Sequence, residues 1–254
     1  MALAAALVLW LSGVFAPVEA LALPYAFADG LLLCALVGSV IVPGLLYVEV
    51  ARRIGSLEAI SKVIDVMGLD PPRAAIVIVT GVGVLLESLT GFGVSLLVTV
   101  PLLFALYSRE RTIGLALIGM SLMPWGALSV SALLGAELAG LPTEVLAAKV
   151  LWTSGPVAFV LPFVCLAFVP GATRGTVLFA AVAGAALVAG IVLTNWAIGV
   201  EVAGVGGGLA VLLLAAIAAP DRRRVWQAAG ASVSRSTSSV GSTSGFGCVN
   251  SIKV

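Results

Sequence analysis

Histidine is absent from this 254-residue sequence, and charged residues make up only 10% of it. Without histidine, the chain lacks the side chain that most often binds metals and acts as a general base near neutral pH. Its three cysteines, Cys34, Cys165 and Cys248, are far apart and form no CxxC pair, so they predict neither a disulfide framework nor a zinc site. These deficits exclude membrane enzymes built on histidine or cysteine–histidine chemistry. We expect no enzyme activity, no metal and no cofactor.

Apolar residues are correspondingly abundant. They make up 61% of the chain, and its mean hydropathy is +1.21. Soluble domains are about a quarter charged, so this composition indicates a polytopic membrane protein. In a bilayer without water, helices satisfy all their own backbone groups, and we predict an all-α fold. The net charge of +1 gives no indication of a nucleic-acid partner, and none is expected.

Long apolar segments predict the transmembrane helices, each of which needs about 20 residues to cross the hydrocarbon core. The segment 2–22 ends in a sequence similar to a signal-peptide cleavage site, but no Lys or Arg precedes Arg52 to form the positive n-region of such a peptide. We predict about six full transmembrane helices, one helical hairpin and one discontinuous helix. The segments of ordinary length are 2–22, 28–51, 113–134, 150–169, 175–194 and 202–219.

The segment 74–107 is too long for one crossing and short for two. Cytoplasmic loops of membrane proteins collect Lys and Arg, so loop charges decide between the alternatives. If the segment crosses once, the basic loops before and after it fall on opposite sides. If it doubles back, one side holds all four basic loops: 52–73, 108–112, 170–175 and 220–224. We therefore predict a hairpin, entered and left from the cytoplasm, with arms 74–90 and 94–107.

The triplet Gly91-Phe92-Gly93 is the predicted tip of this hairpin. Hydrocarbon cannot satisfy the backbone groups of a bend, so the tip must be buried in protein or line a polar cavity. Both arms carry polar or small residues at helical spacing: Thr80, Gly83, Glu87 and Thr90 on the first, and Gly91, Ser95 and Thr99 on the second. The alternative role of the triplet is a notch for helix packing. The segment length and the loop charges favour the hairpin.

The segment 113–134 contains Pro124 and Gly126 near its middle, with Ser121, Ser129 and Ser131 around them. Proline removes a helix donor and clashes one turn back, so we predict an unwound stretch there. Two discontinuous elements at mid-membrane are typical of a transporter binding site. Helix N-termini at such breaks favour an anionic substrate group.

Glu87 is the single acidic residue of the apolar segment 74–107. A central carboxylate costs roughly 2.5–3.5 kcal/mol on insertion scales, and such residues usually serve a function. The segment contains no Lys or Arg to form a local ion pair. The alternatives are a carboxylate that reaches the interface or one that is paired for structural reasons. We predict that Glu87 carries protons or belongs to the substrate site.

The stretch "LLESLTGFGVSLLVTVPLLFAL" resembles the EGxxGFGxP signature of the L-lactate permease family, with Glu87, Gly91, Phe92 and Gly93 matching it. The resemblance continues in "RRIGSLEAI", "IGMSLMPWGALSV" and "AIGVEVAGVGGGLAVLLL" and ends near Arg224. The chain departs from the family pattern in two places. It has Val-Ser after Gly93 where the family favours Thr-Pro, and Trp-Gly-Ala-Leu at 125–128 where the family favours Phe-Gly-Ala-x-Gly.

The resemblance implies a secondary active transporter that moves a small monocarboxylate, such as L-lactate, D-lactate or glycolate, with protons across the bacterial plasma membrane. Glu87 would bind the proton, while Ser88, Thr90, Ser95 and the tip backbone shape the anion site. The alternatives are a related carrier of another small organic anion, or a non-transporting fragment or membrane interaction subunit. The predicted substrate and proton pathway comprises Glu87, Ser88, Thr90, Gly91, Phe92, Gly93, Ser95, Thr99, Ser121, Pro124, Gly126 and Ser129.

Members of this family are longer, with a second half that resembles an inverted repeat of the first. The resemblance thus implies that residues 1–224 form the transmembrane domain of one repeat, and that the chain works with a second half or as a homodimer. Residues 225–254 are rich in serine, and we expect a disordered tail. The alternative is an out-of-frame end of a truncated gene.

The predicted topology is tested by placing single cysteines in a background without the native three. We expect positions 56, 110, 173 and 223 to react with a membrane-impermeant maleimide only from the cytoplasmic side, and positions 140 and 198 only from outside. Labelling of position 110 from outside would show that 74–107 is one long span.

Overall fold

The computed structural model describes residues 23–53, 56–91, 93–126, 129–220, 225 and 227. Every regular element in these ranges is a helix, which confirms the predicted all-α class. The predicted span at 2–22 lies outside the described residues, as does nearly all of the predicted tail. The chain divides into two compact units, Met1–Val40 and Ile41–Val254. The sites described below all lie in the second unit.

Five helices are long and apolar enough to cross a membrane within the part of the chain that the structure describes. Four of them confirm the predicted spans 28–51, 150–169, 175–194 and 202–219. They are Phe27–Val50 in α2 (Leu23–Arg53), α9 (Thr143–Phe168), α10 (Arg174–Ala197), and Val200–Ala218, which joins η5 (Val200–Val202) to α11 (Ala203–Ala218). The fifth, Pro71–Thr90, is the first arm of the hairpin. A shorter helix, α3 (Ser56–Val66), connects α2 to this arm.

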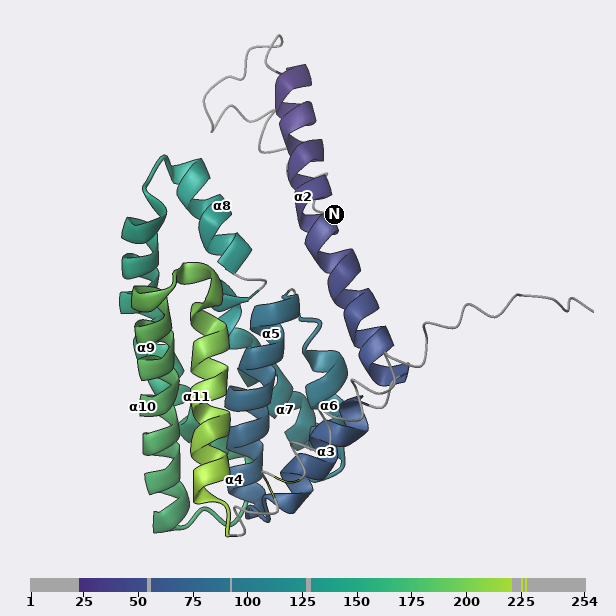
Figure 1. Ribbon diagram of the computed structural model, residues 1–254, viewed down its shortest axis with the longest axis vertical. Helices are drawn as coiled ribbons and strands as arrows, with labels where there is room; N and C mark the ends of the chain where they lie inside the picture. Colours follow the sequence, from purple (N-terminus) through teal and green to yellow (C-terminus); the bar gives the residue numbers. More distant parts are fainter. Residues whose placement is uncertain are drawn as a thin grey trace, which may run out of the picture. The chain divides into compact units, whose positions relative to one another are not determined.

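The hairpin is confirmed, with somewhat different boundaries. Its first arm stacks α4 (Pro71–Ile76), η2 (Val77–Gly83) and α5 (Val84–Thr90), and the chain returns as α6 (Leu96–Phe104), which lies beside this column in Figure 1. Ser95 bonds to Glu87, Thr99 lies against Gly83, and Tyr107 bonds to Pro71. Later residues therefore contact earlier ones, as in an antiparallel pair. Because position 107 returns to position 71, the hairpin enters and leaves at the same end of the bundle.

The middle of the first arm is a π-helix, Val77–Gly83. Such helices make up well under 1% of residues and are frequent at functional sites. Their hydrogen bonds span five residues instead of four, so side chains lose the 3.6-residue period. The 3.6-residue period used for the predicted face therefore applies to Glu87 and Thr90 in α5, whereas Thr80 and Gly83 lie within the π-helix. Thr80, Gly83, Glu87 and Thr90 are nonetheless all buried.

The predicted discontinuous helix is also confirmed. Its parts are α7 (Arg109–Gly119), the 3₁₀ segment η3 (Met120–Trp125) and α8 (Val130–Ala139). Pro124 lies within η3, as expected of a residue that cannot donate to an α-helix. Ser129, the residue before α8, has a φ of 58°, a left-handed conformation that is uncommon outside glycine. The chain therefore changes direction at Ser129, directly before α8.

The pair α10 and α11 packs through glycines. A Cβ atom on Gly190 would lie 2.6 Å from the carbonyl oxygen of Gly206 and 2.9 Å from the Cα atom of Gly207. Small residues allow helix backbones to approach closely where lipid supplies no hydrophobic driving force. Large apolar side chains point outward from α9 and α10: Trp152 is 83% exposed and Trp196 86% exposed. Such exposure indicates lipid contact.

Three of the four predicted cytoplasmic loops meet at one end of the bundle, which is the lower end in Figure 1. One cavity there is lined by Asp70, Arg111 and Thr173, one residue from each of these loops. Gly68 lies near Pro220, which places the end of α11 at the same end. This is the arrangement that the charge distribution predicts.

Replacing Gly190 by alanine tests the glycine packing of α10 and α11. We expect Gly190→Ala to lower stability by about 1–3 kcal/mol, the usual cost of overpacking, because its Cβ would meet backbone atoms that cannot rotate away. A Cβ on Gly30 has no neighbour within 4 Å, so Gly30→Ala is the matched control. Unfolding of the detergent-solubilised chain, followed by circular dichroism, measures both. Equal midpoints for the two variants would contradict the packing role.

Candidate functional site

The Glu87 carboxylate joins the two arms of the hairpin at its tip. It is 4% exposed. Its Oε1 atom accepts a hydrogen bond from the Gly93 N–H at 2.9 Å, and its Oε2 atom accepts one from the Ser95 hydroxyl at 2.6 Å. Both donors belong to the tip or the return arm, six and eight residues further along the chain. The carboxylate therefore fixes the turn as well as sitting beside it.

Two glycines make this geometry accessible. Gly91 ends α5 with a φ of 70°, and Gly93 has a φ of 80°, both in the region where a Cβ atom is disfavoured. The Gly91 N–H donates to the Glu87 carbonyl at 2.7 Å, which closes the last turn of α5. The following Gly93 then turns its own N–H toward the Glu87 side chain. Phe92, also predicted to belong to the site, lies outside the described residues.

The surroundings of Glu87 are polar but uncharged. Among the described residues, no ion pair involves Glu87. The whole stretch from 74 to 106 contains no other titratable side chain, and neither do η3 and α11, which pack against α5. The hydroxyl of Thr99 donates to the Ser95 carbonyl at 3.1 Å and thereby supports the residue that binds Oε2. Glu87 is thus held by neutral donors alone.

The neighbouring hydroxyls of α5 donate to carbonyl groups one turn earlier in the first arm. Ser88 donates to the Val84 carbonyl and Thr90 to the Leu86 carbonyl, each at 2.7 Å. Such back-bonding is common for Ser and Thr within helices. The structure therefore buries Ser88 and Thr90 beside Glu87 but does not direct their hydroxyls toward a shared anion site.

Backbone donors at the tip are occupied as well. The N–H groups that donate within the chain are those of Gly91, Gly93, Val94, Leu96, Leu97 and Val98. In this conformation, the tip backbone offers none of these six donors to a substrate anion. The turn itself therefore uses these N–H groups in this conformation, and the role of the tip backbone in binding an anion stays a prediction.

The discontinuous helix approaches the hairpin tip through η3. A Cβ atom on Gly93 would lie 3.1 Å from the terminal methyl group of Met120. On the other side of α5, Gly204 of α11 leaves room for both the Ser88 hydroxyl and the Trp125 backbone. The two interrupted elements that the sequence singles out are therefore packed together.

The residues around the break have separate roles. Ser129 is fully buried and donates to the Val200 carbonyl at 2.7 Å, so it anchors the break to the start of the last span. Gly126 is buried and accepts from the Ser129 N–H. Ser121 is exposed and donates to the Ile118 carbonyl. Of Pro124, the structure describes only the backbone.

Sequence reasoning missed a buried polar pair beside the break. The Trp125 indole N–H donates to the Ser154 hydroxyl at 3.1 Å, and the two side chains are 1% and 8% exposed. Ser154 precedes Gly155 and Pro156 in a mostly apolar helix, and that local pattern was the available signal. Thr112 of α7, also missed, is completely buried.

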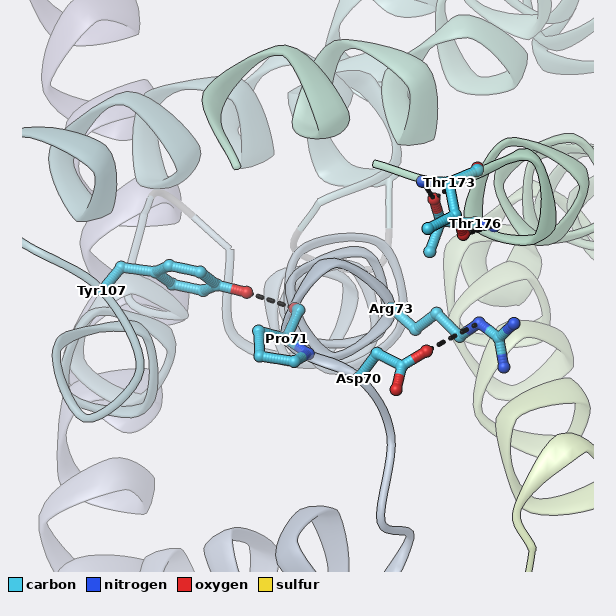
Figure 2. Close-up of polar contacts among 6 residues, drawn as sticks. All are labelled: Asp70, Pro71, Arg73, Tyr107, Thr173 and Thr176. Carbon is cyan, nitrogen blue, oxygen red and sulfur yellow. Dashed lines mark hydrogen bonds and ion pairs between the residues drawn. The ribbon is translucent and has the colours of Figure 1, made fainter. Parts of the chain in front are cut away.

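The base of the hairpin is held by a second polar cluster, shown in Figure 2. The Tyr107 hydroxyl donates to the Pro71 carbonyl. Arg73 lies 3.8 Å from Asp70 and 5.7 Å from the centre of the Phe179 ring. This cluster ties the hairpin to the start of α10 rather than to Glu87.

The contribution of the Ser95–Glu87 bond is measurable as stability. Ser95→Ala leaves one oxygen of a buried carboxyl without its donor, and we expect a loss of about 1.5–3 kcal/mol. Ser88→Ala is the control, since its hydroxyl bonds only to its own helix, and its effect should stay within about 1 kcal/mol. Chemical unfolding in detergent gives both values. A Ser95→Ala variant as stable as Ser88→Ala would show that the bond does not hold the tip.

Comparison with known proteins identifies the family of this chain. A search of curated proteins and a search of solved structures return no match. A model of a protein family, described as L-lactate permease, matches residues 1–246, well past Arg224, where the resemblance in motifs ends. This match, on a multi-helix fold with apolar outer faces, shows that the chain is a multi-pass membrane protein of the L-lactate permease family.

Proposed function

We propose that this chain carries a small monocarboxylate, such as lactate or glycolate, together with protons across the bacterial plasma membrane, and that Glu87 binds the proton. The family points to a transporter rather than an enzyme. The observation that supports proton binding is the setting of Glu87, which is buried between the two arms and held by neutral donors. A carboxyl group paired with Arg or Lys would resist protonation.

Both protonation states of Glu87 have partners. The ionised carboxylate accepts from the Gly93 N–H and the Ser95 hydroxyl. A protonated Glu87 has an O–H to donate, and the Ser95 hydroxyl accepts it after rotating, because serine offers both a donor and lone pairs. The Gly93 N–H can only donate. We therefore assign the transferable proton to Oε2, the oxygen that faces Ser95.

Protonation of Glu87 would also favour binding of the substrate anion at the tip. The bond from Gly93 N–H to Oε1 is charge-assisted while Glu87 is ionised, and such bonds are about twice as strong as neutral ones. Neutralising Glu87 weakens this bond and frees an N–H for a substrate carboxylate. It also removes the like-charge repulsion that opposes an anion beside an ionised acid. In this scheme the proton must bind first, which couples the two fluxes.

Glu87→Gln tests the coupling. The glutamine keeps a neutral, hydrogen-bonding side chain but cannot release a proton, so substrate binding or exchange should persist while accumulation driven by a pH gradient is lost. Glu87→Ala should impair both, because it leaves the tip donors without an acceptor. Thr153→Ala, at an exposed site whose hydroxyl bonds only to carbonyls of its own helix, is the control and should behave like the parent chain.

The measurement is uptake of labelled lactate and glycolate into proteoliposomes, with and without an imposed pH gradient, alongside exchange and binding of the same substrates. Gradient-driven accumulation by Glu87→Gln with an unchanged pH profile would mean that Glu87 is structural and that the proton binds elsewhere.

A further inference from the structure

A cavity of about 540 Å³ lies at the base of the hairpin. Its walls come from the start of α4, the connection between α6 and α7, and the connection between α9 and α10. Because α9 and α10 are both long and apolar enough to cross a membrane, the connection between them lies at the membrane surface. The cavity is therefore at the depth of lipid headgroups, and its volume is within the roughly 300–1,000 Å³ of ligand pockets.

The lining of this cavity combines charged and apolar side chains. Asp70 and Arg111 carry opposite charges, while Leu106 and Val169 supply apolar surface. Leu106 is 40% exposed although it is apolar, and such exposure on a membrane-spanning bundle indicates lipid contact. A ligand with a charged head and an apolar body matches this lining.

Arg111 brings a positive charge to the cavity that no acid of the protein neutralises. Among the described residues, no ion pair includes Arg111. Its guanidinium group offers several N–H donors in a planar fork, which suits the oxygens of a phosphate group. The cavity therefore has a free donor group for an anion.

Asp70 has acceptor capacity to spare on the same wall. Figure 2 shows its carboxylate turned toward Arg73, but the Arg73 Nε atom is 3.8 Å from Oδ2, too far for a hydrogen bond. The Asp70 side chain does not cap α4 either. Together, Asp70, Arg73 and Arg111 carry a net charge of +1. A ligand with one negative charge and a hydroxyl donor would balance that charge and supply Asp70 with a partner.

We propose that this cavity binds the headgroup of an anionic bilayer lipid that carries a phosphodiester and a free hydroxyl, the chemistry of phosphatidylglycerol. The phosphodiester accepts from Arg111, the headgroup hydroxyl donates to Asp70, and the glycerol backbone lies against the apolar side of the cavity. Basic pockets between membrane-spanning helices bind anionic headgroups in this way. A lipid bound here contacts both ends of the hairpin and the start of α10.

Arg111→Gln separates a built site from a general attraction of basic loops for anionic lipid. Arg109→Gln is the matched control, because Arg109 is an exposed arginine of the same loop that does not line the cavity. We expect Arg111→Gln to weaken binding of phosphatidylglycerol about fivefold, the effect of one basic residue near a membrane surface. The control should bind within about twofold of the parent chain, since it keeps the cavity intact.

Asp70→Ala tests the hydroxyl contact. The parent chain should prefer phosphatidylglycerol to phosphatidylmethanol, which has the same charge but no headgroup hydroxyl, by about fivefold, the equivalent of one hydrogen bond. Asp70→Ala should bind both lipids more tightly, because a negative charge is gone, yet lose the preference between them. Asp65→Ala, which removes an exposed carboxylate outside the cavity, should keep the preference.

The measurement is a titration of the full chain in neutral detergent with each lipid, in which native mass spectrometry gives the fraction of chain that carries one lipid. Equal losses in Arg111→Gln and Arg109→Gln would overturn the site in favour of a diffuse attraction. A parent chain without preference between the two lipids would overturn the assignment of Asp70.

Competition with soluble glycerol 3-phosphate distinguishes a lipid from a free phosphate. The soluble anion has the phosphate and hydroxyls of the headgroup but no acyl chains, so we expect it not to displace phosphatidylglycerol at equal concentration. Displacement at equal concentration would assign the cavity to a soluble anion and overturn the lipid. No transport is measured, so these outcomes do not depend on the proposed role of Glu87.

Discussion

A carboxylate placed in an apolar bilayer must find hydrogen-bond donors within the protein, and that requirement organises the rest of this structure. Glu87 finds them in the Gly93 N–H and the Ser95 hydroxyl, both beyond the turn that follows its own helix. These bonds can form only if the chain doubles back at once, so the need to satisfy one buried acid defines the hairpin tip. This tight turn requires glycine at positions 91 and 93, where φ is positive.

The remainder of the hairpin keeps this tip in register. Thr99 lies against Gly83 halfway down, and Tyr107 bonds to Pro71 at the base. Gly83, at the end of the π-helical stretch, and Glu87 of α5 both meet the return arm, because residues four apart in a helix lie on the same face. The discontinuous helix also supports the hairpin tip. Met120 packs on Gly93, and the Ser129 hydroxyl bonds the start of α8 to the Val200 carbonyl.

Much of the architecture was predictable because lipid limits the options. Segment length, together with the distribution of Arg and Lys among the loops, was enough to predict the hairpin, and Pro124 was enough to predict the break. The directions of the hydroxyls were not predictable, because a buried Ser or Thr can serve either a ligand or its own helix, and Ser88 and Thr90 do the latter. The π-helix and the Trp125–Ser154 pair depend on tertiary packing across distant segments, which hydropathy does not encode. Glu87 was identified from the sequence as an acid within an apolar segment, and it is buried, whereas its predicted role as a proton carrier or substrate-site residue stays a prediction.

The choice of neutral donors around Glu87 has a consequence for how the site can work. An arginine partner would stabilise the ionised form more strongly, but it would also hold the acid in that form. An N–H and a hydroxyl stabilise the ionised state, while the hydroxyl can reverse its role and accept from the protonated state. Ser95 stands where the family pattern favours proline, which has no hydroxyl, so this chain uses a side chain of its own to support both states. In the proposed scheme, a proton bound by Glu87 changes the strength and direction of the hydrogen bonds that hold the two arms together, so its uptake acts directly on the geometry of the turn.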